Sequence, residues 1–551
     1  MDNQKFLLII ALGIILFLIF QAWQQEHQPA PAPAPEAKAP AEQEVPEAPP
    51  PQASSPTATA TPATPAPSAP VSPPRGTRIK VTTDVIEVVI DAAGGGLREL
   101  KLREYPVSVD EPDNPFMLLT DDRKDMYMTQ SGLIGSGREY PNHNTRYTAD
   151  SQRYVMAAGQ DELKVPLRWQ GPDGVRYTKV FTFHRDSYLI DVDYLVENSS
   201  ATPWQGYLYR QFRRRYVPVT ASWLRRLPTY LGGAIYTPEE KYEKISFDDM
   251  REEPLERDAS GGWVAMIQHY FVGAWLPPSE ARNRFYAKAL QANTYIIGLK
   301  QLDPTNVAPG GSARLRAKIY AGPKLHERLK GLSPGMELTV DYGWLTLISA
   351  PLFWLLSFIH GWVGNWGWAI IVLTMMIKAV FFPLSAASYR SMAHMKRVQP
   401  KLQSLRERFG HDRQRMNQAM MELYKKEKIN PLGGCLPIAI QIPVFIALYW
   451  VLLESVEMRQ APFIFWLRDL SSPDPYFVLP IIMGISMFLQ QKLSPTQLDP
   501  MQRKIMSALP IVFTVFFLWF PAGLVLYWVT NNILSIAQQW QITRMITARA
   551  K

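Results

Sequence analysis

The pattern of apolar residues along this chain changes near residue 338. Before that point, short apolar runs alternate with polar residues, and after it long uninterrupted apolar runs dominate. In the run 188–196, every second residue from Tyr188 to Val196 is large and apolar, and two aspartates lie between them. This period of two predicts a strand with one buried face.

Residues 76–338 hold many runs of this kind. Turn residues separate them, as at 94–96, 171–174 and 309–311, where glycine, proline and aspartate gather. The segment is about 260 residues long, which is enough for one large antiparallel β-sandwich. We therefore expect an all-β domain over 76–338.

The apolar runs after residue 338 are typical of membrane helices. Residues 339–362 are interrupted by Pro351, Ser357 and His360 and flanked by aromatic residues, which predicts an amphipathic helix at the membrane interface. The fold class is therefore expected to be mixed, with a polytopic α-helical membrane domain joined to the all-β domain. The membrane core, 363–551, is predicted to hold five transmembrane helices, at about 366–383, 432–453, 477–489, 505–520 and 523–538.

A further apolar run lies at the N-terminus, over residues 6–23. About 18 helical residues span roughly 27 Å, close to the hydrocarbon thickness of a bilayer. The residues around Ala22 are too bulky for a signal-peptide cleavage site. We expect an uncleaved signal anchor over 1–27, with a cleaved signal as the alternative.

Residues 28–75 have a different composition. Sixteen of the 47 prolines fall within them, and almost all their other residues are Ala, Ser, Thr, Glu or Gln. Such a stretch cannot bury enough apolar surface to offset the entropy lost on ordering. We expect a disordered, semi-stiff linker over 28–75.

Charge distribution predicts the orientation of the chain. The whole chain has a formal net charge of +9. The segment 384–430 alone holds eleven basic and four acidic residues, whereas 454–475 has a net charge of −2. Because basic loops stay on the cytoplasmic side, we expect 384–430 and both termini in the cytoplasm and the β domain outside it.

The basic segment 384–430 also shows helical periodicity. Apolar residues recur every three or four positions on both sides of Gly410, which predicts a helical hairpin with a basic surface. The hairpin is either a solvated loop or a docking surface for ribosomal RNA, anionic lipid or a nascent chain. Its candidate contact residues are Arg390, Lys396, Arg397, Lys401, Arg406, Arg408, Arg413 and Arg415.

Signatures of catalysis are missing from the sequence. It contains no Walker phosphate loop, no HExxH zinc helix and no GxSxG elbow, and its one cysteine, Cys435, is expected to be a packing residue. Arg210 and the run 213–215 are interpreted as a solvated strand edge, with an anion site as the alternative. We therefore expect no enzyme, no metal, no cofactor and no small-molecule substrate.

One ionisable residue, Lys378, lies inside an apolar run. A charge there costs on the order of 2.5–3.5 kcal/mol, and such residues usually face a bundle interior or water. Polar residues also recur along the last predicted helix, so we expect a hydrophilic groove open to the cytoplasm. The alternative is that Lys378, near the end of its span, reaches the cytoplasmic surface. The candidate groove residues are Lys378, Thr374, Gln441, Trp528, Asn531, Asn532 and Ser535.

The chain also carries longer motifs. They are GWVAMIQHYF at 262–271, GNWG at 364–367, NPLGGC at 430–435, RQAPF at 459–463, DPMQ at 499–502 and FPAGLVLY at 520–527. Together they resemble the motifs of YidC-type membrane protein insertases of Gram-negative bacteria, from end to end. The resemblance implies an inner-membrane protein with a periplasmic β super-sandwich, an N-terminal anchor and five core spans.

By this resemblance, Lys378 takes the position of the family's groove arginine, and Thr374 and Trp528 line the path of the substrate. A lysine keeps the positive charge of that arginine but loses its planar fork. The expected function is insertion, and assisted folding, of inner-membrane proteins, alone or with the Sec translocon. Nascent membrane proteins, the ribosome, Sec translocon components and anionic phospholipid are the expected partners. The alternative is a polytopic transporter or channel with an accessory periplasmic binding domain.

Overall fold

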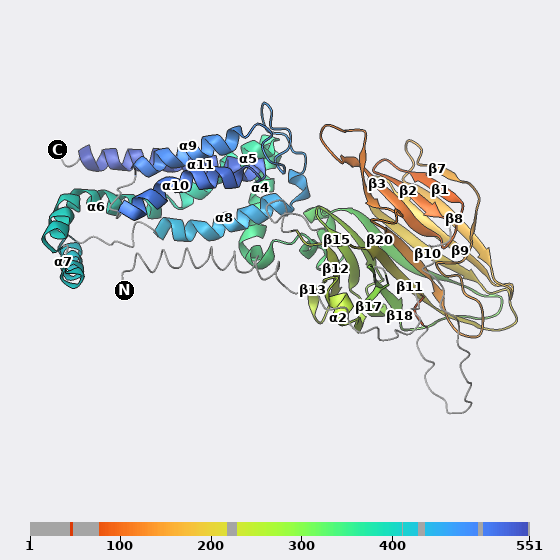
Figure 1. Ribbon diagram of the computed structural model, residues 1–551. Coiled ribbons are helices and arrows are strands. Elements are labelled where there is room, and N and C mark those ends of the chain that lie inside the picture. Colours follow the sequence, from red (N-terminus) through yellow and green to blue (C-terminus); the bar gives the residue numbers. More distant parts are fainter. Residues whose placement is uncertain are drawn as a thin grey trace.

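The computed structural model describes residues 45–47, 76–217, 229–291, 293–409, 412–427, 436–493 and 500–548. The predicted anchor, the predicted linker except 45–47, and Cys435 lie outside the described residues. The side chains of Lys396, Arg397, Arg406 and Arg413 lie outside them as well. Figure 1 shows two parts joined end to end, a β domain and a bundle of helices.

The β domain consists of strands with two short helices between or after them. The strands are β1 (Arg78–Thr82), β2 (Ile86–Asp91), β3 (Gly96–Pro106), β4 (Pro115–Leu119), β5 (Tyr127–Ile134), β6 (Thr148–Ala149), β7 (Arg153–Val155), β8 (Glu162–Gln170), β9 (Arg176–His184), β10 (Leu189–Glu197), β11 (Trp204–Arg215), β12 (Gly232–Thr237), β13 (Lys241–Ile245), β14 (Leu255–Ser260), β15 (Trp263–Gln268), β16 (Phe271–Leu276), β17 (Arg282–Leu290), β18 (Thr294–Gln301), β19 (Thr305–Val307) and β20 (Ser312–Pro323). The helices are α2 (Asp249–Glu252) and α3 (His326–Lys330).

Three sheets make up the domain. A five-stranded sheet has the order β4-β3-β2-β1-β7, and a nine-stranded sheet has the order β13-β12-β15-β16-β20-β10-β9-β8-β6. The six-stranded sheet runs β14-β17-β18-β11-β19, with β5 paired to β11. Neighbouring strands are antiparallel except β1 and β7, which are parallel. The prediction of a large, mainly antiparallel β domain is confirmed.

The core of the domain lies between the two larger sheets. The predicted alternation holds in β10, where Ile190 and Val192 are fully buried while the aspartates between the apolar residues are partly exposed. β5 faces β10 across the core, because the hydroxyl groups of Ser131 and Tyr194 lie 3.1 Å apart. The apolar face of β10 thus packs against the opposite sheet, as its period of two requires.

The arginines of β11 do not lie at a solvated edge, so that interpretation is wrong. β11 lies inside its sheet, between β5 and β18. Arg210 is 2% exposed, and its Nη2 donates to Asn283 Oδ1 at 2.9 Å. The Arg214 guanidinium lies 4.7 Å over the ring of Tyr127. The partners of these cations lie far away in sequence, and local patterning does not reveal them.

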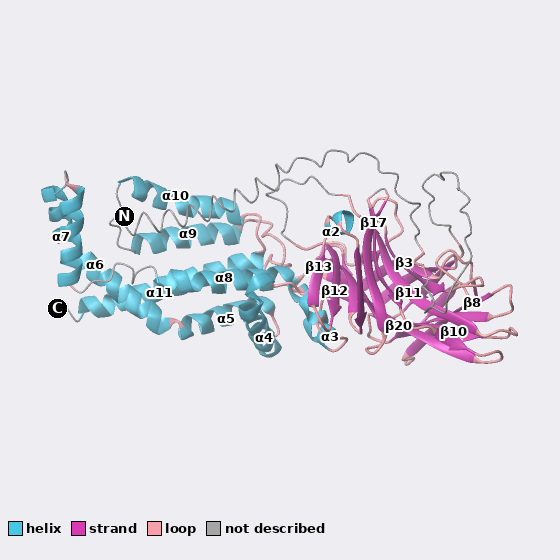
Figure 2. Ribbon diagram, turned by 90° about the horizontal axis from the view of Figure 1, so that it is seen from below, coloured by secondary structure: helices cyan, strands magenta, loops and turns pink. Residues whose placement is uncertain are grey.

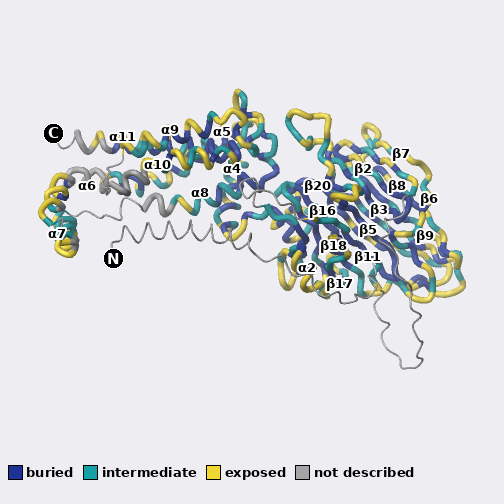
Figure 3. The backbone as a smooth tube through the Cα atoms, viewed as in Figure 1, coloured by how far each residue is buried: buried dark blue, intermediate teal, exposed yellow. Residues whose placement is uncertain are grey.

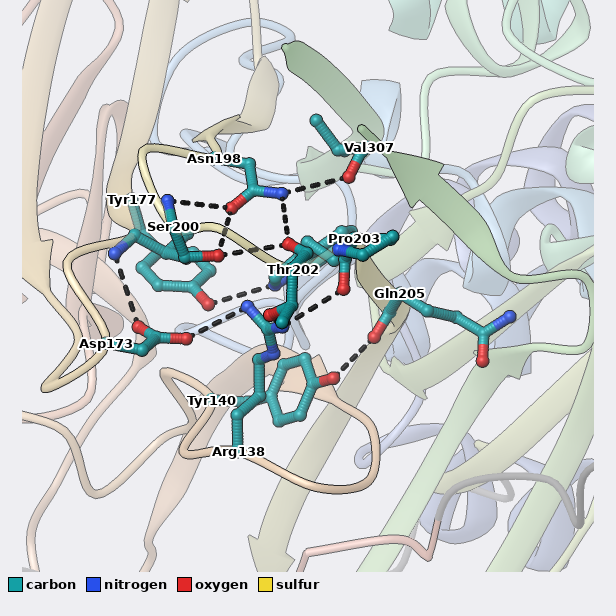
Figure 4. A network of polar contacts seen from close by, with 12 residues as sticks. Arg138, Tyr140, Asp173, Tyr177, Asn198, Ser200, Thr202, Pro203, Gln205 and Val307 are labelled. Carbon is teal, nitrogen blue, oxygen red and sulfur yellow. Dashed lines mark hydrogen bonds and ion pairs between the residues drawn. The ribbon is translucent and has the colours of Figure 1, made fainter. Parts of the chain in front are cut away.

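A polar network ties several loops of the β domain to one another (Figure 4). Asn198 Nδ2 donates to the carbonyl oxygens of Thr202 and Val307 at 2.9 and 3.0 Å. Arg138 donates from Nη1 to Asp173 Oδ2 at 2.9 Å and from Nη2 to Thr202 Oγ1 at 3.0 Å. These contacts join loops from four separate parts of the chain.

The helical part follows the β domain in sequence. Its helices are η2 (Met336–Thr339), η3 (Gly343–Leu345), α4 (Thr346–Val363), α5 (Trp366–Val380), α6 (Phe382–Phe409), α7 (Arg413–Lys426), α8 (Leu436–Glu454), η5 (Val456–Met458), α9 (Val478–Leu493), α10 (Pro500–Phe517) and α11 (Ala522–Ala548). Figure 2 shows α5, α8, α9, α10 and α11 running alongside one another. The α7 helix lies at the end of this bundle that is farthest from the β domain (Figure 1).

The helices overlap all five segments predicted as spans, with different bounds. The largest difference lies in 366–383, where α5 ends at Val380 and α6 starts at Phe382 with a bend of 61°. Pro383 is the second residue of α6. A proline is tolerated in the first turn of a helix because its missing N–H would have no partner there. Pro383 therefore marks the start of a new helix.

Length and composition single out one described helix that could cross a membrane by itself, Gly343–Val363. A second candidate arises if Trp366–Val380 and Phe382–Arg390 are taken as one bent span. Gly343–Val363 contains α4, which the sequence places at the membrane interface. Its Trp354 and Trp362 side chains are 64% and 81% exposed. The interfacial position of α4 and the number of spans stay predictions.

A buried ion pair joins the two parts of the molecule. Lys324 directly follows β20 and Glu454 ends α8, and their Nζ and Oε2 atoms lie 3.1 Å apart with side chains 2% and 4% exposed. Beside them, His269 Nε2 donates to the Leu453 carbonyl at 3.0 Å. Burial lowers the pKa of His269 to about 4. The neutral ring thus binds a carbonyl group at the end of α8, where the helix itself supplies no partner.

The loop after α8 extends this junction. Arg459 Nη2 and Gln460 Nε2 both donate to the Pro106 carbonyl, at 2.6 and 2.9 Å. The Arg459 guanidinium also lies 5.7 Å from the ring centroid of Phe271. Two motifs, 262–271 and 459–463, therefore meet where the β domain contacts the helices.

Candidate functional site

The candidate groove residues lie where α5, α8, α9 and α11 pack together. The α11 helix packs along both α9 and α5. Glycines allow close approaches around it, since a Cβ atom on Gly367 would lie 2.1 Å from Phe463 and one on Gly484 would lie 2.0 Å from Thr514 Oγ1. Asn365 caps α5 by accepting from the main-chain N–H of Trp368 at 3.2 Å. These local features fix α5 and α9 against their neighbours.

Lys378 reaches across to α11. Its Nζ donates to Ser535 Oγ at 2.7 Å, and Ser535 in turn donates to the Asn531 carbonyl at 2.7 Å. Lys378 is 9% exposed and Ser535 is 3% exposed. In the described part of the chain, no Asp or Glu forms an ion pair with Lys378. The ammonium group is therefore directed into the bundle, toward a neutral partner.

Amide side chains continue this polar cluster along α11. Gln441 of α8 donates to Asn531 Oδ1. Asn532 is 4% exposed and donates from Nδ2 to Ser486 Oγ of α9 at 3.0 Å. Asn531 and Ser535 lie one turn apart on α11, and Asn532 is adjacent to Asn531. Through these residues α11 binds polar side chains of α5, α8 and α9.

Trp528 lies on α11 one turn before Asn531, among aromatic rings. Its ring centroid is 4.5 Å from that of Phe445 and 5.4 Å from that of Phe517. Its indole Nε1 is buried and has no hydrogen-bond partner among the described residues. The Trp528 ring therefore separates the polar cluster from an aromatic region formed by α8 and α10.

Thr374 lies one helical turn before Lys378 on α5. It is 1% exposed, and its hydroxyl donates to the Ile370 carbonyl of its own helix at 2.7 Å. The structure thus brings five of the candidate residues together where α5, α8, α9 and α11 pack. They are Lys378, Ser535, Asn531, Gln441 and Asn532. Thr374 lies next to that set, and its hydroxyl group bonds within its own helix.

Two polar residues belong to this region although the sequence analysis does not single them out. Ser486 is 6% exposed and accepts from Asn532. The hydroxyl group of Tyr389, on α6, lies close to Ser535. Ser486 is the one hydroxyl residue within the apolar segment 477–489. A single polar residue in such a segment could have indicated a buried polar contact. Tyr389 follows the unforeseen bend between α5 and α6, so its position could not be inferred.

The predicted hairpin corresponds to α6 and α7. Lys401 Nζ of α6 lies 2.7 Å from Glu427 Oε1, directly after α7, so this pair joins the two helices. Arg390, Arg408 and Arg415 are exposed. The hairpin lies at the opposite end of the molecule from the β domain (Figure 1).

Several helices carry exposed residues (Figure 3), and many of these residues are large and apolar. Ile485 of α9 is 56% exposed, and Ile511 and Val512 of α10 are 69% and 59% exposed. Large exposed apolar faces of this kind suit contact with lipid or another apolar partner. A buried lysine and amides inside such a bundle can solvate a polar or acidic segment that enters it.

Comparison with known proteins finds two matching family models. Residues 78–355 match the model described as YidC periplasmic domain, and residues 358–549 match the model described as 60Kd inner membrane protein. The membrane protein insertase YidC of Methylococcus capsulatus is 51% identical over 556 residues, with 100% of both chains covered. That of Stutzerimonas stutzeri is 50% identical over 557 residues, again with 100% of both chains covered.

Solved structures give weaker similarities. The crystal structure of an active YidC insertase with its first transmembrane domain resolved aligns with a TM-score of 0.38 and 17% identity, covering 84% of this chain and 92% of that chain. A galactose mutarotase related enzyme from Lactobacillus acidophilus aligns with a TM-score of 0.30 and 9% identity. It covers 44% of this chain and 97% of its own.

Proposed function

We propose, from the premise that this chain belongs to the YidC family of membrane protein insertases, that it inserts proteins into the bacterial inner membrane and assists their folding. The observation that carries the proposal is the full-length match to curated insertases at about half identity. This match favours an insertase over the alternative of a transporter or channel. The action is non-enzymatic and depends on solvating a substrate.

The polar cluster around Lys378 is proposed as the substrate groove. A hydrophilic segment of a substrate must cross an apolar layer in which unsatisfied polar groups are expensive. Lys378, Gln441, Asn531 and Asn532 would shorten that path and attract acidic segments. The apolar helix of the substrate would then leave past Trp528 into lipid, driven by the partitioning of its side chains.

The direction of the Lys378 side chain supports this role. An ammonium group that snorkels to the surface would run along its own helix toward the nearest end. Here it donates to Ser535 on α11, inside the bundle. A diffuse positive field suffices in this proposal, since a lysine lacks the planar fork of an arginine.

The remaining parts are assigned by charge and position. The basic hairpin of α6 and α7 would lie in the cytoplasm with both termini, and would meet the ribosome, the nascent chain and anionic phospholipid. Its place at the end of the molecule opposite to the β domain supports this orientation. The β domain would lie in the periplasm, where it would contact partners such as the Sec translocon.

Replacement of Lys378 by Arg and by Met tests the groove. Two unit charges about 12 Å apart at an effective dielectric constant of about 20 attract by roughly 1.4 kcal/mol, or tenfold. We therefore expect Lys378→Met to insert a single-span substrate with an acidic translocated segment about tenfold less well in cells depleted of other insertase. Lys378→Arg should retain insertion. The readout is the protease accessibility of the translocated segment.

Two controls make the result specific. Lys492→Met removes an exposed lysine at the end of α9 and should leave insertion unchanged. A substrate with a neutral translocated segment should respond less to Lys378→Met than the acidic one. Normal insertion of both substrates by Lys378→Met would show that the charge has no role and would favour the snorkelling interpretation.

A further inference from the structure

A short piece of the predicted linker lies against the β domain. Residues 45–47 line one side of a hollow of about 250 Å³, whose other side is formed by β11, β14, β17 and β18. Lys300 of β18 donates from Nζ to the main-chain carbonyl of Glu47 at 3.1 Å. The contact lies 31 residues before Arg78, where β1 begins.

The floor of this hollow is fixed by its own hydrogen bonds. Tyr286 is 8% exposed and donates to Gln211 Oε1 at 2.7 Å. Gln211 is fully buried, and its Nε2 donates to Gln130 Oε1 at 2.7 Å. Because these polar groups bind one another, the floor is preorganised and a ligand does not have to order it.

Val45 makes the apolar part of the contact. It packs against a small separate cluster of Ile134, Tyr207 and Tyr209, on β5 and β11. Residues 28–75 contain only two large apolar side chains, Val45 and Val71. Val45 is therefore one of the two linker residues that could bury a large apolar side chain, and it packs against the domain.

Charge favours the same segment. Of the four acidic residues in 28–75, three lie within 42–47. On the side of the β domain, the hollow is lined by three basic residues, Arg284, Lys288 and Lys300, and one acidic residue, Glu256. Arg284 is paired with Asp258, so Lys288 and Lys300 carry most of the attraction for an acidic segment. Proline at position 46 restricts the segment to an extended form, so less entropy is lost when it binds.

We propose that this hollow is a binding groove for an acidic Val-Pro segment and that its occupant is 45–47 of the same chain. Docking divides the linker into a stretch of 17 residues, 28–44, between the predicted anchor and the groove, and a closed loop that returns to β1. At about 3.3–3.6 Å per residue, the first stretch spans at most about 60 Å. The groove thus limits how far the β domain moves from the anchor.

Crosslinking in the full chain tests the proposal. Cys435→Ser removes the single native cysteine, and Glu256→Cys places a thiol at the exposed rim of the groove. The second thiol is Glu47→Cys, or Thr61→Cys as a matched position on the same linker. A bifunctional maleimide is added to membranes, and the rate of intramolecular crosslinking is followed by gel mobility.

The two possibilities predict opposite orders of rate. For an undocked linker, effective concentration falls as about the −3/2 power of length, so position 47, at 31 residues from Arg78, reacts about 2.5-fold more slowly than position 61, at 17 residues. For a docked segment, we expect position 47 to react at least about tenfold faster than position 61. Equal rates, or a faster reaction at 61, would overturn the proposal.

A matched pair of substitutions tests the recognition chemistry. Val45→Asp should reduce crosslinking at position 47 to the level seen at position 61, whereas Val71→Asp should leave it unchanged. Both substitutions lie in the linker and leave the β domain intact. Retention of the fast crosslink in Val45→Asp, or its formation between two copies instead of within one, would overturn the assignment of 45–47 as the occupant.

Discussion

Lys179 is the buried charge whose effect on stability is best defined by its surroundings. It is fully buried on β9, and its Nζ donates to the Gly95 carbonyl at 2.6 Å and to Ser131 Oγ at 2.9 Å. Burial and then the nearby charge of Arg98 lower the pKa of Lys179 from 10.5 to about 7. We expect Lys179→Met to change how the stability of the β domain depends on pH.

The sign follows from proton binding. Between pH 7 and 10.5 the unfolded chain holds a proton on Lys179 that the folded domain does not hold, so stability rises with pH across this window. The slope is about 1.4 kcal/mol per pH unit in the middle of the window. Below pH 7 Lys179 is protonated in both states. The free energy of unfolding is then lowered by the full cost of burying the charged ammonium group, about 5 kcal/mol.

Paired unfolding measurements isolate this effect. The β domain, 76–338, is unfolded in urea with and without Lys179→Met, and the fluorescence of the buried Trp204, Trp263 and Trp275 is recorded. All other titrating groups are present in both proteins, so their contributions cancel in the difference between the two free energies of unfolding. Between pH 6 and pH 9 the wild type should gain about 2.5 kcal/mol relative to the variant. A difference that stays constant over this range would refute the reasoning.

Two further predictions concern packing. Lys324→Met leaves the Glu454 carboxylate buried without its partner and should cost about 3–5 kcal/mol, seen as faster proteolysis at the junction in detergent. Lys324→Met with Glu454→Leu should recover most of that loss, and no recovery would contradict the ion-pair account. Gly484→Ala places a Cβ atom 2.0 Å from Thr514 Oγ1 and should cost about 1–3 kcal/mol, measured as a lower Tm. Gly361→Ala, with nothing within 4 Å of the new Cβ, should not lower the Tm, and an equal loss in both variants would contradict the packing argument.

Local sequence patterns predict the strands and helices of this molecule well, because the buried face of each element determines the spacing of its apolar residues. The alternation around Ile190 and Val192 predicts β10, whose apolar side is buried. The long apolar runs after residue 338 predict helices for the same reason. Their ends are less predictable, because capping and bending decide them. Pro383 is compatible with the end of one helix or the start of the next, and only the structure distinguishes these cases.

Long-range contacts set the limit of sequence reasoning for the candidate site. Helical spacing places Asn531 and Ser535 on one side of a helix, but the bond from Lys378 to Ser535 joins residues 157 positions apart. The burial of Arg210 depends on Asn283, which is 73 positions away. A sequence pattern shows which face of an element is polar, and it does not show which partner that face meets.

Photocrosslinking at Trp528 tests the central proposal most directly. A photoreactive residue replaces Trp528 in ribosome-loaded membranes that carry a short, single-span nascent chain, and Leu347 of α4, which is 88% exposed, is the matched control position. The groove proposal predicts a crosslink to the nascent chain from position 528 that exceeds the one from position 347. No crosslink from position 528, together with robust insertion after depletion of this protein, would contradict it.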